Sequence, residues 1–406
     1  MRKIAFWLSL AFIFSIPWEN SVVLPGLGSI ARIIGLLATA SWMGKVLFKG
    51  ELRRPHLFHL AMFAYIAWNA ATIFWSIKPD NTFNRIETYI QLFIFSLLIW
   101  DLLDNRDSLD DGLQMYILGG GVAIVSTIFN YFAGVGVRGG IRYAASGFDP
   151  NDMGITLAIG MPMAWYLATS SRERTLGWLL RLINYAYIPG AVMAILLAAS
   201  RTSLIATAPA SLYVLMTFSR LRLMTRIIVF SILIYALFII QPLIPDSSFQ
   251  RLSQTGDSIA SGNLTGRVDI WREGYQVFAA HPLNGVGSGT FRDAIDKKKA
   301  PHNVFVALST ETGLIGISLI GLILLIVIQQ IWRHPSWTER LLWTSILSIW
   351  FLGAITLNWE YRKPTWLLFL LIVCSANVLS KQLKEVETAP IRQELLPLHP
   401  GIALKR

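Results

Sequence analysis

The sequence contains very little cysteine and very little charge. Its single cysteine, Cys374, lies within an apolar run, which excludes an intrachain disulfide and a thiolate metal cluster. Its expected role is that of a small buried hydrophobe. Charged residues make up 15% of the 406 residues, whereas a soluble domain of this size carries many more on its surface. The low charge therefore excludes a water-soluble protein.

Long apolar runs dominate what remains. Apolar residues account for 54% of the chain, and the mean hydropathy is +0.52. Crossing a hydrocarbon core takes about 20 apolar residues in a helix. The sequence predicts an all-α polytopic integral membrane protein with about twelve transmembrane helices, at residues 4–17, 28–48, 57–76, 86–103, 113–134, 152–170, 182–200, 202–219, 226–243, 303–331, 340–358 and 364–380.

The predicted spans form one domain, without a detectable internal repeat. We expect a transmembrane domain over residues 1–380, including one large loop at 244–302, and a polar tail at 381–406. The first apolar run, Ile4–Ile16, follows a basic start as a signal peptide would, but no small-residue cleavage site comes after it. It is therefore expected to be a retained helix.

Lysine and arginine predict the orientation. If the N-terminus is cytoplasmic, the larger share of them falls in inner loops and in the tail, as the positive-inside rule requires. An even number of helices returns the C-terminus to the cytoplasm. Both termini and the 381–406 tail are thus expected inside, and the 244–302 loop outside.

Basic residues on the outer face indicate an anionic ligand, because positive charge there works against insertion. The alternative is snorkelling at the level of the lipid headgroups, which we favour for the lysines. The outer set comprises Lys78, Arg85, Arg138, Arg142, Arg201, Arg251, Arg267, Arg272, Arg292, Lys297, Lys298, Lys299, Arg362 and Lys363.

Two outer arginines point to a diphosphate. Arg201 interrupts an apolar stretch from Tyr187 to Phe218, so the chain must turn sharply there or form a re-entrant pair, and the guanidinium requires a partner. Arg267 begins a predicted amphipathic helix of the large loop, capped by Thr265. Guanidinium groups match phosphate oxygens bidentately. The alternative for Arg267 is a surface pair with Asp269 or Glu273.

The position of His302 in the sequence makes it a candidate catalytic residue. It lies where a long polar segment meets an apolar run, so it is expected at a membrane face near a helix N-terminus. The pattern reads His302, Asn303, nine residues, Gly313, two residues, Gly316. A neutral imidazole can accept a proton. The two glycines are expected to let a neighbouring helix approach closely and so hold His302 in position.

Three other outer segments carry polar side chains. The alternate glycines of 281–289 predict a tight turn rather than a phosphate loop, with His281 as a turn residue or a second base. Asp149 and Asp152 suit a helix cap better than a metal site. Before the last span, Glu360 and Arg362 are expected either to lie on the same membrane face as His302 or to belong to an aromatic belt at the membrane interface.

The sequence resembles the O-antigen ligase and polymerase superfamily over roughly residues 190–370. Four segments carry the resemblance, namely those around Arg201 and around Arg267, and those at 281–287 and 302–316. The resemblance implies a polytopic, GT-C-like glycosyltransferase of the bacterial inner membrane. It implies a glycan donor on undecaprenyl diphosphate and an acceptor sugar on the lipid A core. Transfer at the periplasmic face is expected to need no nucleotide sugar, metal or other cofactor, and no nucleic acid.

The resemblance also assigns residues. Its histidine falls on His302, its two arginines on Arg201 and Arg267, and its acidic residue, more loosely, on Glu360. Substrate-binding roles are expected for four further residues, Arg142, Arg138, Asn303 and Arg362. His302 would take a proton from the acceptor hydroxyl, while arginines would stabilise the departing diphosphate. A polymerase, a protein O-oligosaccharyltransferase and a lipid-linked oligosaccharide transporter remain as alternatives.

Overall fold

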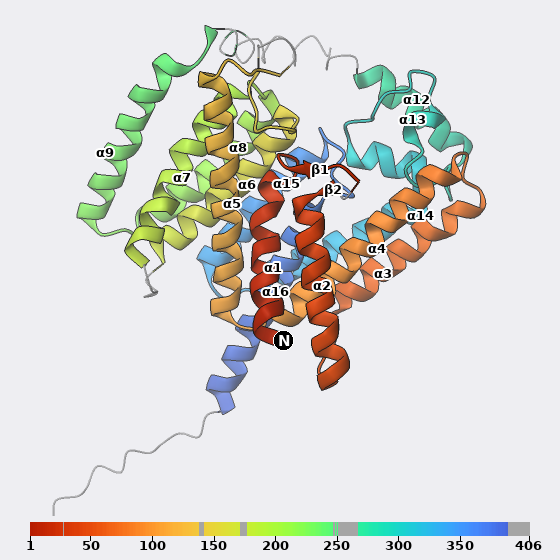
Figure 1. Ribbon diagram of the computed structural model, residues 1–406, viewed down its shortest axis with the longest axis horizontal. Helices are drawn as coiled ribbons and strands as arrows, with labels where there is room; N and C mark the ends of the chain where they lie inside the picture. The colour runs from red at the N-terminus through yellow and green to blue at the C-terminus, as the bar shows by residue number, and fades with distance from the viewer. Residues whose placement is uncertain are drawn as a thin grey trace, which may run out of the picture.

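A computed structural model describes residues 1–26, 28–137, 142–170, 177–246, 248, 250 and 267–388, and this part is mostly helical (Figure 1). The helices of four or more residues are α1 (Arg2–Ser15), α2 (Ile30–Lys49), α3 (Leu57–Ala71), α4 (Pro79–Leu102), α5 (Arg106–Phe132), α6 (Pro150–Thr169), α7 (Gly177–Leu197), α8 (Arg201–Phe218), α9 (Leu223–Ile240), α12 (Arg267–Ala280), α13 (Phe291–Ala294), α14 (Val304–Trp332), α15 (Trp337–Ala354) and α16 (Lys363–Thr388). Two short strands, β1 (Val23–Leu24) and β2 (Gly28–Ser29), form an antiparallel pair.

Each predicted span overlaps one of the helices α1–α9 and α14–α16. Within the described residues, six helical segments are long and apolar enough to cross a membrane, namely Ile30–Lys49, Leu57–Phe74, Arg106–Phe132, Gly177–Leu197, Val304–Trp332 and Lys363–Ser380. The protein is thus an all-α membrane protein. That all twelve helices cross the bilayer, and that the fold is GT-C-like, stay predictions. Helix α16 continues beyond residue 380, where the tail was expected to begin.

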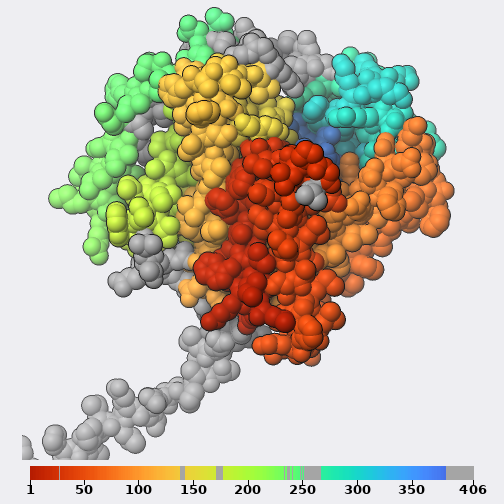
Figure 2. Space-filling model, in the orientation of Figure 1, coloured from red at the N-terminus to blue at the C-terminus, as the bar shows by residue number. Residues whose placement is uncertain are grey.

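Helix α16 forms the centre of the bundle. Its residues from Trp366 to Cys374 are at most 2% exposed, and it packs against α4, α5, α14 and α15. A helix that is apolar on every side is buried in this way. At the periphery, α2 and α9 leave large apolar side chains such as Leu47 and Phe230 exposed, as lipid-facing helices do. Figure 2 shows both helices on the outside of the molecule.

The loops gather at two opposite ends of the bundle. At one end, loops predicted to be outside meet, and Arg362 pairs with Asp152 at 3.4 Å. At the other end, which contains the N-terminus, segments predicted to be inside meet, and Lys45 pairs with Asp101 at 2.8 Å (Figure 1). The sidedness of these two ends relative to a membrane stays a prediction.

Helix α14 is broken at Gly313, whose φ is +66°. The segment 281–289 fills the break: the Leu314 amide donates to the Pro282 carbonyl at 2.8 Å, and the Gly287 amide donates to the Glu311 carbonyl at 2.9 Å. These bonds satisfy the backbone groups that the break frees, as a broken helix in a membrane requires. The predicted tight turn at 281–289 is present, with positive φ at Gly285, Gly287 and Gly289.

The expected role of the two glycines of α14 is wrong. A Cβ on Gly313 would lie 2.4 Å from the Leu283 carbonyl group, so this glycine admits a loop and not a helix, and a Cβ on Gly316 would meet Thr312 of its own helix. The close helix approach occurs instead at Gly274 of α12. There a Cβ would lie 2.8 Å from Phe291, and the Thr310 hydroxyl donates to the Gly274 carbonyl at 3.1 Å.

Gly313→Ala should destabilise the protein by about 2–4 kcal/mol, because it adds a strained left-handed conformation to a backbone clash. The measurement is the apparent melting temperature of the purified protein in detergent. Gly321→Ala is the matched control, since it lies on the same helix with open space around it. Equal melting temperatures for the two variants would show that α14 can straighten without cost.

Candidate active site around His302

His302 lies in a tight turn directly before α14. The Asn303 side chain caps the helix, with Oδ1 accepting from the amides of Phe305 at 2.9 Å and Val306 at 3.2 Å. On the other side, the Trp271 indole of α12 donates to the Pro301 carbonyl at 2.8 Å. His302 itself has a φ of +48° and an exposed side chain. Such a backbone costs about 1–3 kcal/mol and persists only where its surroundings enforce it.

The electrostatic surroundings favour a neutral imidazole. Although the side chain is exposed, the protein around the imidazole displaces part of its water, which lowers the pKa of His302 below its usual 6.5. The positive charges of Arg267 and Arg292 lower this pKa further, against the opposing effect of Asp149 and Asp152. The neutral form therefore predominates at pH 7, and it can act as a base. In the described part of the chain, no hydrogen bond to the imidazole is found.

Arg267 lies at the start of α12, the helix predicted in the large loop. Its Nη1 donates to the Thr356 carbonyl at 3.3 Å, and burial lowers its pKa while Asp149 opposes this. The alternative pairing with Asp269 or Glu273 is wrong, because both carboxylates pair with Lys297, at 3.5 and 3.2 Å. The expected cap, Thr265, lies outside the described residues.

Arg201 begins α8 directly after a sharp turn, as one of the two sequence alternatives predicted. The turn is tied to the start of α6, since the Ser200 hydroxyl donates to Asn151 Oδ1 at 2.9 Å. Arg142 strengthens the same connection, with Nε donating to the Ala198 carbonyl at 2.8 Å and Nη2 to Asn151 Oδ1 at 2.9 Å. Arg142 is only 2% exposed and positions the turn, and a substrate-binding role for it stays a prediction.

The two aspartates of α6 have structural partners. Asp149 caps the helix as predicted, accepting from the Asn151 amide at 2.8 Å. Asp152 accepts from the Trp359 indole at 3.0 Å and pairs with Arg362. Among the described residues, no group of three or more His, Cys, Asp or Glu side chains could hold a metal ion. A substrate-binding role for Arg362 stays a prediction, and Arg138 lies outside the described residues.

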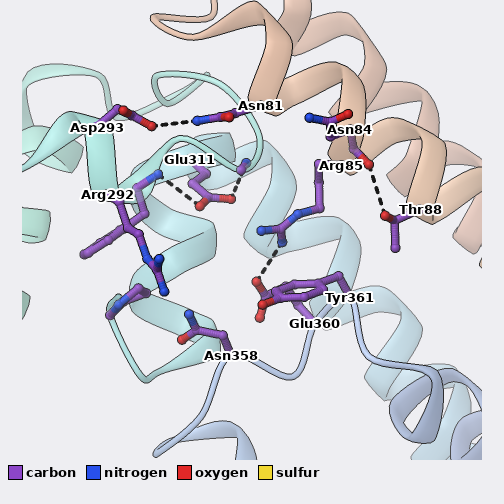
Figure 3. A pocket seen from close by; sticks show the side chains of 13 residues that line it. Asn81, Asn84, Arg85, Thr88, Arg292, Asp293, Glu311, Asn358, Glu360 and Tyr361 are labelled. Atoms are coloured by element: carbon purple, nitrogen blue, oxygen red, sulfur yellow. Dashed lines mark hydrogen bonds and ion pairs between the residues drawn. The ribbon is translucent and has the colours of Figure 1, made fainter. Parts of the chain in front are cut away.

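Glu360 lines a pocket of about 400 Å³ next to the His302 turn (Figure 3). Its carboxylate is 3% exposed and its Oε1 pairs with Arg85 Nη1 at 2.9 Å. The Arg85 guanidinium also lies over the Tyr361 ring, 3.9 Å from its centroid. A catalytic role for Glu360 stays a prediction, and Arg85 was one of many outer basic residues with no signal to single it out.

Sequence analysis also missed Glu311. This residue is 4% exposed, and its carboxylate accepts from the amides of Gly289 at 2.7 Å and Phe291 at 3.1 Å. It thereby fastens the 285–291 segment against α14 at the pocket wall. A signal was available, because an ionisable residue inside an apolar run is a functional-site hypothesis by default.

Comparison with known families gives one match. Residues 187–321 match the family model described as O-antigen ligase, which covers about a third of the chain. The matched segment contains Arg201, Arg267 and His302. No curated protein and no solved structure matches the chain.

Proposed function

We propose that this membrane protein, whose residues 187–321 match the family model described as O-antigen ligase, is an enzyme that transfers an O-antigen glycan from undecaprenyl diphosphate to a sugar hydroxyl of the lipid A core. The observation that carries the proposal is the exposed side chain of His302 just before α14, close enough to Arg267 for its charge to lower the pKa of the imidazole. Both residues, and Arg201, lie in the matched segment.

The proposed reaction is a direct displacement. His302 takes the proton of the acceptor hydroxyl as the oxygen attacks the anomeric carbon of the donor. The bond from that carbon to the diphosphate oxygen breaks, and the lipid diphosphate leaves with its electron pair and added negative charge. Arg201 and Arg267 stabilise this charge. A single displacement inverts the configuration at the anomeric carbon.

The proposed location is the bacterial inner membrane, with the reaction at its periplasmic face. Support comes from the distribution of basic residues, which predicts cytoplasmic termini. Helices α12 and α13, which precede His302 in the chain, lie at the end of the bundle opposite the N-terminus (Figure 1). The lipid-linked donor and the lipid A-core acceptor would both reach the site from the surrounding lipid.

The test is incubation of the purified protein with lipid-linked glycan and lipid A core in liposomes, followed by identification of the molecule that carries the glycan. Glycan on the lipid A core supports the proposal. Longer glycans on undecaprenyl diphosphate would indicate a polymerase, and glycan on added protein would indicate a protein oligosaccharyltransferase. Movement of unchanged donor across the bilayer would indicate a transporter.

Metal chelation should leave the rate of transfer unchanged, because the proposal assigns stabilisation of the diphosphate to arginines where many enzymes use a metal ion. The measurement compares initial rates with and without EDTA. An inactive preparation that recovers with one divalent ion would contradict the arginine mechanism, and Asp149 and Asp152 would then be the first ligands to test.

A further inference from the structure

The pocket beside His302 is built from four separate segments (Figure 3). They are the start of α4, the 289–293 segment with α13, the first half of α14 with Pro301 before it, and the 358–361 segment before α16. Its volume of about 400 Å³ is within the range of small-molecule sites. Because Pro301 lines it, the pocket lies directly beside the His302 turn.

Several polar groups of the pocket already have partners that fix its walls. Arg85 pairs with Glu360 Oε1, and the Asn81 amide donates to Asp293 Oδ2 at 2.7 Å. Glu311 accepts two backbone amides. The walls are thus held by bonds between segments far apart in the sequence, so the pocket is preformed.

Two residues of the lining each have a buried side-chain oxygen without a partner among the described residues, namely Oε2 of Glu360 and Oδ1 of Asn358. Both can only accept hydrogen bonds, and Glu360 is 97% buried, since its exposed fraction is 3%. A buried acceptor without a donor is costly and calls for an explanation. A ligand that fills this pocket therefore has to bring hydrogen-bond donors.

The charge of the lining decides which donors fit. The lining holds two arginines, Arg85 and Arg292, and three carboxylates, which belong to Asp293, Glu311 and Glu360. Arg85 already pairs with Glu360, and Glu311 accepts from two backbone amides, so the lining offers little net charge to attract a charged group. Hydroxyl groups donate without carrying charge. Sugars present several hydroxyl groups on one rigid ring.

We infer that this pocket binds one sugar ring, with two of its hydroxyl groups donating to Glu360 Oε2 and Asn358 Oδ1. The origin of the sugar rests on the proposed function: it belongs either to the acceptor, near the hydroxyl that His302 deprotonates, or to the first unit of the donor glycan. Both sources share this chemistry, and kinetics with each substrate varied in turn distinguishes them.

The kinetic test uses Asn358→Ala and Glu360→Gln. Each should raise KM for the substrate that supplies the sugar by about 10- to 100-fold, the usual effect of losing a hydrogen bond to a buried or charged group, with a smaller change in kcat. Asn358→Ala leaves the Arg85–Glu360 pair intact, so it tests the pocket without unpairing a buried charge. A raised acceptor KM assigns the pocket to the acceptor, and a raised donor KM assigns it to the donor.

The matched control is Glu87→Gln on α4, since Glu87 is half-exposed, pairs with Arg32 at 3.3 Å and lies outside the pocket. A substrate lacking the bound hydroxyl should lose about 10-fold or more in kcat/KM with the wild type, and little with Asn358→Ala or Glu360→Gln. Variants that match Glu87→Gln in both KM values would overturn the inference.

Direct binding separates this inference from the proposed function. Saturation-transfer NMR with free methyl pyranosides and their single-deoxy derivatives needs no transfer activity. Signals that appear with the wild type and disappear with Asn358→Ala support the pocket even if the enzyme transfers no glycan. Absence of any such signal across the panel would mean that water fills the pocket, and the inference would fail.

Discussion

Replacing His302 with alanine should reduce glycan transfer by about 100- to 10,000-fold, the range typical of a lost general base, while the lipid-linked donor still binds. The imidazole acts on the acceptor hydroxyl and not on the diphosphate, so donor affinity does not depend on it. The measurements are the initial rate of transfer and the dissociation constant of the donor. Wild-type transfer should also fall as the pH drops below a pKa that lies under 6.5, because protonation removes the base.

A second variant guards against a folding defect. His302 has a left-handed backbone, which asparagine accepts more readily than alanine. His302→Asn should therefore melt close to the wild type and yet be as inactive as His302→Ala. Substantial turnover in either well-folded variant would remove His302 from the mechanism.

Exchanging Arg201 or Arg267 for lysine should lower turnover by roughly a hundredfold or more, which corresponds to about 3 kcal/mol of transition-state stabilisation. Lysine keeps the point charge but loses the planar pair of donors that matches two phosphate oxygens. The measurement is kcat for each variant under saturating donor, with the KM values of both substrates recorded.

Arg272→Lys is the control for these exchanges. Arg272 is exposed on the same helix as Arg267, and exposed charges act through screened, long-range attraction. It should change turnover little. Near-normal rates in both Arg201→Lys and Arg267→Lys would show that charge alone matters at these positions, and the two arginines would then be membrane-interface anchors.

Local sequence patterns were enough to predict the positions of the helices and the start of the helix next to His302. Apolar runs predicted a helix at every position where α1–α9 and α14–α16 occur, because length and apolarity are properties of a continuous segment. The polar-to-apolar change at His302 predicted a helix beginning there. Arg201 interrupts an apolar stretch, and a guanidinium within hydrocarbon is costly without a partner. Its position therefore predicted the turn before α8.

Local sequence patterns did not predict which side chains pair with one another. Arg85 and Glu360 are 275 positions apart, and only the packing of α4 beside the end of the chain brings them together. Likewise, Asp269 and Glu273 lie within two turns of Arg267, yet both pair with Lys297. Sequence spacing gives the possible pairs on one helix, but the position of the other elements decides which pair forms.

The sequence by itself determined that this is a helical membrane protein, since composition and periodicity act segment by segment. That the candidate base and the arginines share one face of the membrane stays a prediction. The tertiary structure alone decided that α14 breaks at Gly313 to admit the 281–289 segment, and that Glu311 and Glu360 face one pocket. Both outcomes depend on backbone and side-chain groups of distant segments satisfying one another's hydrogen bonds. No local pattern records which distant groups those are.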